Sequence, residues 1–182
     1  MSCAVWTVGH STRPIETFMS LLLAHAIRQV VDVRAFPYSP RYPQFHTAAL
    51  SASLQQAGLA YRHVPSLGGR RKSRPDSVNQ GWRNASFRGY ADYMQTEAFQ
   101  EGLSELMALA ATGSTVILCA EAVPWRCHRS LIADALTFRG CEVRHIMTVT
   151  KADRHRLTSF ATVDHGVLTY PLPAAESGPL LL

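Results

Sequence analysis

The chain has 182 residues, 47% of them hydrophobic, which suits one globular domain with a sizeable core. It has no run of eighteen apolar residues, and residues 1–10 lack the pattern of a secretory signal, so we expect no membrane partner. The net charge of +5 comes from one segment: residues 66–90 hold six basic residues and one acid, whereas the rest of the chain has twelve of each.

Short apolar runs alternate with segments whose apolar residues repeat at helical spacing. In chain order, we expect a strand at 4–8, a helix at 14–26, a strand at 29–33, a helix at 47–57, a strand at 59–63, a helix at 90–111, a strand at 115–119, a helix at 125–138 and a strand at 142–146. A proline-rich loop follows the second strand, and residues 65–88 show no period, which is typical of a functional or disordered loop.

This alternation predicts one α/β domain over residues 1–150. Its sheet would be mostly parallel and five-stranded, with helices on both faces in a Rossmann-like, three-layer arrangement. Residues 151–182 are expected to form a C-terminal extension, poorly ordered from residue 171.

The four cysteines do not form a dense disulfide framework. We therefore expect reduced thiols and a cytoplasmic protein. Cys3 and Cys141 are expected to pack in or near strands, as buried free cysteines do.

Polar side chains follow the predicted strand ends, where open α/β sheets bind ligands. His10 and Ser11 follow the first strand, Asp32 and Arg34 end the second, and Cys119 ends the fourth. Arg62 and His63 end the third strand, and His145 lies near the end of the fifth. Alternatives remain open: Asp32 and Arg34 could pair with each other, and His10 or Ser11 could cap the following turn.

The densest polar stretch is residues 119–129. If Arg126 and Arg129 lie in the first turn of the helix at 125–138, the helix dipole disfavours them by roughly 0.3–1 kcal/mol each unless an anion is bound. We therefore predict an anion site formed by Arg34, Arg126, Arg129 and Ser11.

Three interpretations compete for Cys119 and Cys127. They could be reactive thiols activated by arginine, His128 and the helix start, or structural residues of a buried core. They could also form a metal site with His128 or His10, but the seven-residue gap between the cysteines is not a usual zinc spacing, and Cys127 and His128 would be adjacent on one helix. We favour the reactive thiol and predict neither a metal nor a cofactor.

The arginine-rich segment suggests a second class of function. Arg70, Arg71 and Arg74 could contact nucleic acid, since arginine's planar fork suits phosphate. The aromatic residues of 36–45 could stack on bases or pack the proline-rich loop.

The sequence also resembles the family called domain of unknown function 488. The resemblance runs from about residue 5 to residue 146, and Cys119-x-Glu121 with Cys127-His128-Arg129 is its most specific block. Its other segments are Thr7-Val8-Gly9-His10-Ser11, Asp32-Val33-Arg34, Pro37 with Ser39-Pro40, Leu67-Gly68-Gly69, Phe87 and Tyr90-Ala91 with Tyr93-Met94. It implies a compact α/β domain with a shared site, and no particular activity.

The sequence thus favours an enzyme that binds a phosphate-bearing ligand, either a nucleotide or nucleic acid, at the carboxyl edge of the sheet. Its reaction class is open, and so are its protein partners. The catalytic candidates are Cys119, Glu121, Cys127, His128, Asp32 and His10. The alternative is an arginine-rich nucleic-acid-binding module without catalysis.

Overall fold

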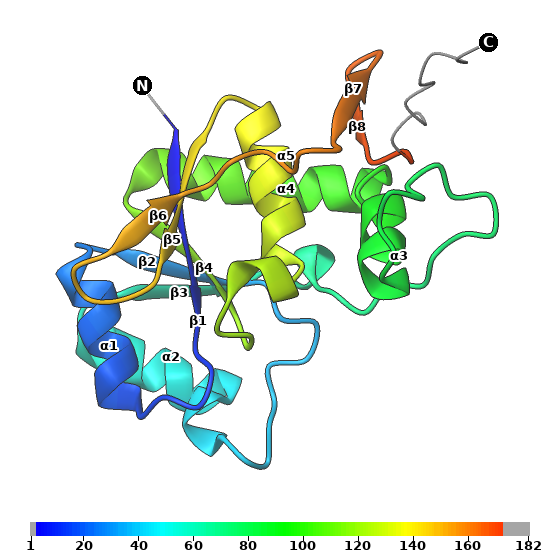
Figure 1. Ribbon diagram of the computed structural model, residues 1–182. Helices are drawn as coiled ribbons and strands as arrows, with labels where there is room; N and C mark the ends of the chain where they lie inside the picture. The colour runs from blue at the N-terminus through cyan, green and yellow to red at the C-terminus, as the bar shows by residue number, and fades with distance from the viewer. Residues whose placement is uncertain (1–2, 173–182) are drawn as a thin grey trace, which may run out of the picture.

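A six-stranded sheet forms the centre of the computed structural model, which describes residues 3–172 (Figure 1). The strand order is β3-β2-β4-β1-β5-β6, in which the first five strands are parallel and β6 is antiparallel to β5. The strands are β1 (Ala4–Gly9), β2 (Gln29–Asp32), β3 (Ala60–His63), β4 (Thr115–Cys119), β5 (Glu142–Ile146) and β6 (Ala152–Arg154).

Helices cover both faces of this sheet (Figure 1). On one face, Phe18 and Leu22 of α1 pack with Leu50 and Leu54 of α2 in one core cluster. On the other face, α3, α4 and α5 contribute to a second cluster. The helices are α1 (Ile15–Ala24), α2 (Thr47–Gln56), α3 (Ala85–Tyr93), α4 (Glu97–Thr112) and α5 (Arg129–Phe138).

The five predicted strands are confirmed. Every residue of the central strand β4 is buried, as expected for a parallel strand covered on both faces. The predicted count of five was wrong, because the short strand β6 adds a sixth. The Rossmann-like order is not confirmed either, since β4 lies between β1 and β2 instead of beyond β1.

Two predicted helices have different bounds in the structure. The helix expected at 90–111 is two helices, because Thr96 accepts a hydrogen bond from the backbone N–H of Phe99 and so begins α4 as its N-cap. The helix expected from residue 125 begins at Arg129. The three residues before Cys127 form the short 3₁₀ helix η3 (Pro124–Arg126), and Cys127 itself is extended.

The long loop between β3 and α3 is held by a buried carboxylate. Asp92 accepts hydrogen bonds from the hydroxyl of Ser77, the amide of Asn79 and the backbone N–H of Arg74. The side chain of Asn79 in turn accepts from the backbone N–H of Tyr170. This loop therefore has a defined shape, which includes the 3₁₀ helix η2 (Pro65–Leu67).

The predicted C-terminal extension contacts the rest of the domain. It contributes β6 to the sheet, and β7 (Thr162–Asp164) pairs with β8 (Val167–Thr169) in a hairpin. The ring of Tyr170 is buried, and its hydroxyl donates to the carboxylate of Asp134 on α5. Of the tail predicted from residue 171, residues 173–182 lie outside the described part of the chain.

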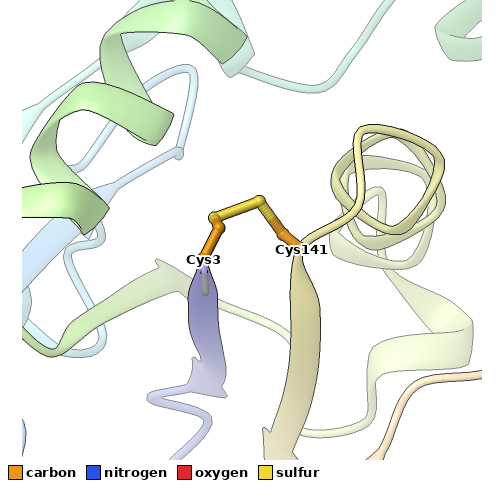
Figure 2. The surroundings of a disulfide bond; sticks show 2 residues. All are labelled: Cys3 and Cys141. Atoms are coloured by element: carbon orange, nitrogen blue, oxygen red, sulfur yellow. A yellow bond between two sulfur atoms is a disulfide. The ribbon is translucent and has the colours of Figure 1, made fainter. Parts of the chain in front are cut away.

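A disulfide joins Cys3 to Cys141, so the prediction that these two thiols are reduced was wrong (Figure 2). The two residues lie 138 positions apart, at the amino ends of the neighbouring strands β1 and β5. Parallel pairing of these strands brings the two side chains together, which spacing along the chain could not show. Cys119 and Cys127 are free and buried.

Within residues 3–172, no helix has both the length and the apolar character needed to cross a membrane.

Replacing both disulfide cysteines, as C3S/C141S, should lower the free energy of unfolding by about 3–5 kcal/mol, because the bridge closes a very long loop in the unfolded chain. Urea denaturation of the wild type and the variant measures this difference. The secondary structure seen by circular dichroism should not change, and a difference below about 1 kcal/mol would contradict the prediction.

Candidate functional site

A cavity of about 580 Å³ lies at the carboxyl ends of β1, β2 and β4. The chain leaves β1 for α1 on one face of the sheet, and leaves the neighbouring β4 for α5 on the other face. Such a reversal opens the crevice in which α/β sheets commonly bind ligands. The cavity is lined by residues 10–12, 34–36, 38, 39, 42, 69, 70, 119–122 and 128.

Two thiols and an imidazole meet at this edge, in what we call the thiol–imidazole cluster: Cys119, Cys127 and His128. His128 Nδ1 lies 3.9 Å from the Sγ of Cys119 and 3.7 Å from that of Cys127. The three ligand atoms all lie within 4.8 Å of one another. The cluster brings together three of the six predicted catalytic residues.

The orientation of the His128 ring follows from its other nitrogen. Nε2 lies 3.1 Å from the carbonyl oxygen of Val33. A carbonyl only accepts, so Nε2 carries the hydrogen, and in the neutral ring the lone pair of Nδ1 faces the two sulfurs. Gly69 lies directly over the ring, since a Cβ at this position would come within 2.9 Å of Nδ1.

The environment favours a thiolate on Cys127. The hydrogen bond with the Cys119 thiol lowers the pKa of Cys127 well below its ordinary value, and the positive charge of Arg129 acts in the same direction. The backbone N–H of Arg129 also lies 3.5 Å from the Cys127 sulfur. The same hydrogen bond and burial raise the pKa of Cys119. Cys127 is therefore the thiol of the pair that loses its proton first, with the Cys119 thiol as its hydrogen-bond donor.

Arg129 follows the cluster in the chain, and its side chain is 1% exposed. Its guanidinium donates to the carbonyl oxygens of Glu121 and Ala122, at 2.5 and 3.3 Å, and to the hydroxyl of Thr7. It does not line the cavity of about 580 Å³. Arg129, one of the residues predicted to bind an anion, thus anchors the loop that follows β4.

Gly9 allows this loop to pass close to β1. A Cβ at position 9 would come 1.7 Å from the carbonyl oxygen of Glu121, which no side chain can accommodate. The backbone N–H groups of His10 and Ser11 donate to the carbonyls of Cys119 and Ala120. The two strand ends are therefore fastened together at the cavity.

A hydrogen-bonded chain runs from Arg129 away from the cavity. Thr7 accepts from Arg129 and lies 2.8 Å from Nδ1 of His145, whose Nε2 lies 3.0 Å from Nδ1 of His155. Nε2 of His155 lies 2.8 Å from the buried carboxylate of Asp134. One direction of donation, from Arg129 to Asp134, satisfies every partner with both histidines neutral. Thr7, Asp134 and His155 were not among the predicted site residues, because no pattern in the sequence links them.

Asp32 and Arg34 form a buried ion pair, which is the structural alternative left open by the sequence. The carboxylate of Asp32 also accepts from the hydroxyl of Tyr61, so it has no free position for proton transfer. Arg34 donates through Nη1 to Nε2 of His10 at 3.3 Å and also lines the cavity. Burial lowers the pKa of His10 to about 4, so this ring is neutral.

The mouth of the cavity carries exposed groups. Phe36 and Tyr38 are 70% and 68% exposed, and the guanidinium of Arg70 lies 5.8 Å above the Phe36 ring. Ser11 and Arg70 both have left-handed backbones, with φ of 52° and 62°. Strained non-glycine residues of this kind cluster at functional sites. The exposed Glu121 lies at the same mouth.

The other predicted arginines lie elsewhere. Arg126 is exposed in η3, outside the first turn of α5 where we expected it, and it lines a smaller cavity of about 150 Å³ that also reaches Cys127 and His128. Arg71 packs 3.6 Å from the centre of the Tyr93 ring, and Arg74 pairs with Asp76 at the surface.

Comparison with known families gives one match. Residues 14–136, more than half of the chain, match the model of the family described as "Domain of unknown function DUF488". The chain belongs to this family. No curated protein and no solved structure matches the chain significantly. The DUF488 match covers the thiol–imidazole cluster, Arg34 and Arg70, whereas His10 and Ser11 lie before its first residue.

Because His10 and His145 are buried as neutral rings, we expect the protein to lose stability in mild acid. Burial lowers the pKa of His10 and of His145 to about 4, below the ordinary value of 6.5, so between these values the unfolded chain binds more protons. Stability should be full above pH 6.5 and should fall toward pH 4, by on the order of 3 kcal/mol for each histidine.

Urea denaturation at several pH values measures this loss. An H145N variant should show a shallower dependence on pH than the wild type. An H165N variant is the matched control, because His165 is 95% exposed, and it should follow the wild type. Equal slopes for H145N and the wild type would contradict the assignment.

Proposed function

We propose that the protein is an enzyme that binds a phosphate-bearing ligand in the larger cavity and acts on it with the thiol–imidazole cluster. The observation that carries this proposal is that Cys119 and His128 line the same cavity as Arg34 and Arg70. A binding surface and reactive groups thus share one space at the carboxyl edge of the sheet.

The arginines supply the affinity for an anion. Asp32 neutralises most of the charge of Arg34, but Asp32 and His10 do not use all five N–H donors of its guanidinium. Arg70 has no ion-pair partner among residues 3–172. It therefore contributes a full charge at the cavity mouth, where a phosphate would form charge-assisted hydrogen bonds.

The exposed aromatic rings favour a ligand with a flat group beside its phosphate. Phe36 and Tyr38 line the cavity but leave most of their surface in solvent. Stacking of a nucleobase on such a ring contributes about 1–3 kcal/mol. A nucleotide satisfies both the arginines and the rings, so it is the ligand class that we favour.

The cluster supplies reactive groups at the inner end of the cavity. Cys119 lines the cavity, the pKa of Cys127 is lowered, and His128 Nδ1 can accept or return a proton beside both sulfurs. Glu121 at the mouth is the remaining carboxylate candidate. Asp32 and His10, both predicted as catalytic, are engaged by Arg34 and are better suited to positioning it.

A nucleic-acid-binding module without catalysis is the second candidate. The charge of residues 66–90 favours it, but Arg71 and Arg74 already pack against Tyr93 and Asp76. Of the three arginines predicted to contact nucleic acid, Arg70 alone lines the cavity. We therefore place this function second.

We also propose a cytoplasmic location, since two buried free thiols in one site suit a reducing compartment. The disulfide between Cys3 and Cys141 is the feature that weighs against this location.

Titration calorimetry with adenosine monophosphate, adenosine and inorganic phosphate tests the ligand class. The monophosphate should bind more tightly than either of its parts. R70A should weaken binding by about tenfold, the loss expected for one charged hydrogen bond. The matched control is R62A, because Arg62 is an exposed arginine on β3 outside the cavity. Equal affinities of R70A and R62A would contradict the proposal.

The chemistry is tested by screening nucleotides and phosphate esters for turnover with phosphorus NMR. C119S and C127S should keep their affinity for the ligand within a few fold and lose at least about a hundredfold in turnover, as expected when a reactive group is removed. Folded variants that turn over substrate at the wild-type rate would rule out a role for the thiols.

A further inference from the structure

The nitrogen–sulfur distances in the thiol–imidazole cluster are close to those of a zinc site. Tetrahedral zinc lies about 2.3 Å from a thiolate sulfur and about 2.0–2.1 Å from an imidazole nitrogen, which places nitrogen and sulfur about 3.6 Å apart. In this structure Nδ1 of His128 lies 3.7 and 3.9 Å from the two sulfurs. We propose that Cys119, Cys127 and His128 bind a Zn²⁺ ion.

The groups around the cluster are those that a metal ligand needs. The carbonyl of Val33 fixes the His128 tautomer that directs the lone pair of Nδ1 toward the sulfurs. Metal-bound histidines commonly donate their other N–H in this way. The backbone N–H of Arg129 faces the Cys127 sulfur, as suits a thiolate. Two thiolates and one divalent cation are neutral together, which suits a buried position.

Backbone geometry removes the objection that Cys127 and His128 are adjacent on one helix. Neighbouring residues of one helix point in different directions, but Cys127 lies before α5 with an extended backbone, at φ −137° and ψ 146°. His128 is the N-cap of α5, at φ −57° and ψ −12°. The change of conformation between them directs both side chains to Cys119, so the unusual spacing in the sequence still forms a compact ligand set.

Three protein ligands leave one tetrahedral position open. Cys119 and His128 line the larger cavity, so water or an oxygen of a bound ligand could reach the ion from there. Zinc sites with three protein ligands and one open position are typical of catalysis. In the metal-bound protein the two sulfurs are ligands, and this open position takes over the role proposed above for a free thiol. The metal site itself stands on the cluster geometry and does not depend on the proposed nucleotide.

Metal binding is measured on the full chain after treatment with a chelator. Zn²⁺ is titrated in competition with a chromophoric chelator, and Co²⁺ is added as a spectroscopic probe. We expect one ion per chain, a sulfur-to-cobalt charge-transfer band and the intense visible bands of tetrahedral cobalt. A wild-type protein with neither band overturns the proposal, whatever its variants do.

The variants C119S, C127S and H128Q should each weaken Zn²⁺ binding by at least about a hundredfold, since each removes one of three ligands. H165N and C3S/C141S are controls that should bind as the wild type does. Loss of binding in C3S/C141S with retention in C119S would also overturn the proposal, because it would place the ion at the other cysteines. Circular dichroism of each metal-free variant separates loss of a ligand from loss of the fold.

The experiments can refute the proposed metal site and the proposed nucleotide ligand independently of each other. Absence of metal binding, with ligand binding that still depends on Arg70, would refute the metal site and leave the proposed ligand class intact. Metal binding without any nucleotide affinity would do the reverse.

Discussion

The buried guanidinium of Arg129 is the constraint on which the rest of the site depends. The guanidinium donates to the loop after β4 and to the hydroxyl of Thr7 on β1, and the backbone N–H of Arg129 contacts the sulfur of Cys127. These contacts hold the ends of two central strands and the start of α5 in one arrangement. The cavity and the cluster both form where these three segments meet.

The charge of Arg129 is also accommodated in an unusual way. No carboxylate pairs with it within residues 3–172, although burial of an unpaired cation is costly. Carbonyl oxygens satisfy part of its hydrogen-bonding capacity, and its charge in turn lowers the pKa of the nearby Cys127 thiol. On the other side, Thr7, His145 and His155 connect it to the carboxylate of Asp134. The hydrogen bonds of Arg129 thus fasten the two strand ends, and its charge favours loss of the proton from the neighbouring Cys127 thiol.

Much of the fold could be predicted from the sequence because the parallel strands are short, apolar and buried. The strands at 115–119 and 142–146 have the predicted bounds, and the others differ by one residue at an end. The short edge strand at 152–154 has no apolar run, because two of its three residues are charged and exposed. The sequence therefore carried no strand signal there. The break between α3 and α4 depends on one capping residue, Thr96, within an otherwise continuous apolar pattern.

The location of the site was predictable, whereas the roles within it were not. Polar residues after several strands indicated the carboxyl edge, and His10, Arg34, Cys119, Glu121 and His128 do line its cavity. The role of each of these residues depends on the direction of its side chain, which the sequence alone does not show. Arg34 and Arg129 were both expected to hold an anion, yet one faces the cavity and the other faces the loop carbonyls. The partners of His128 and His145, such as the Val33 carbonyl and His155, depend on contacts between distant segments.

Amide hydrogen exchange in an Arg129→Gln variant tests the central claim most directly. The backbone N–H groups of His10 and Ser11 donate to the carbonyls of Cys119 and Ala120, so they report on the joint between the two strand ends. If Arg129 holds this joint, these two amides should exchange much faster in the variant, while the amides within α1 and α2 keep their protection. Unchanged protection at His10 and Ser11, or an equal loss of protection throughout the domain, would contradict this account.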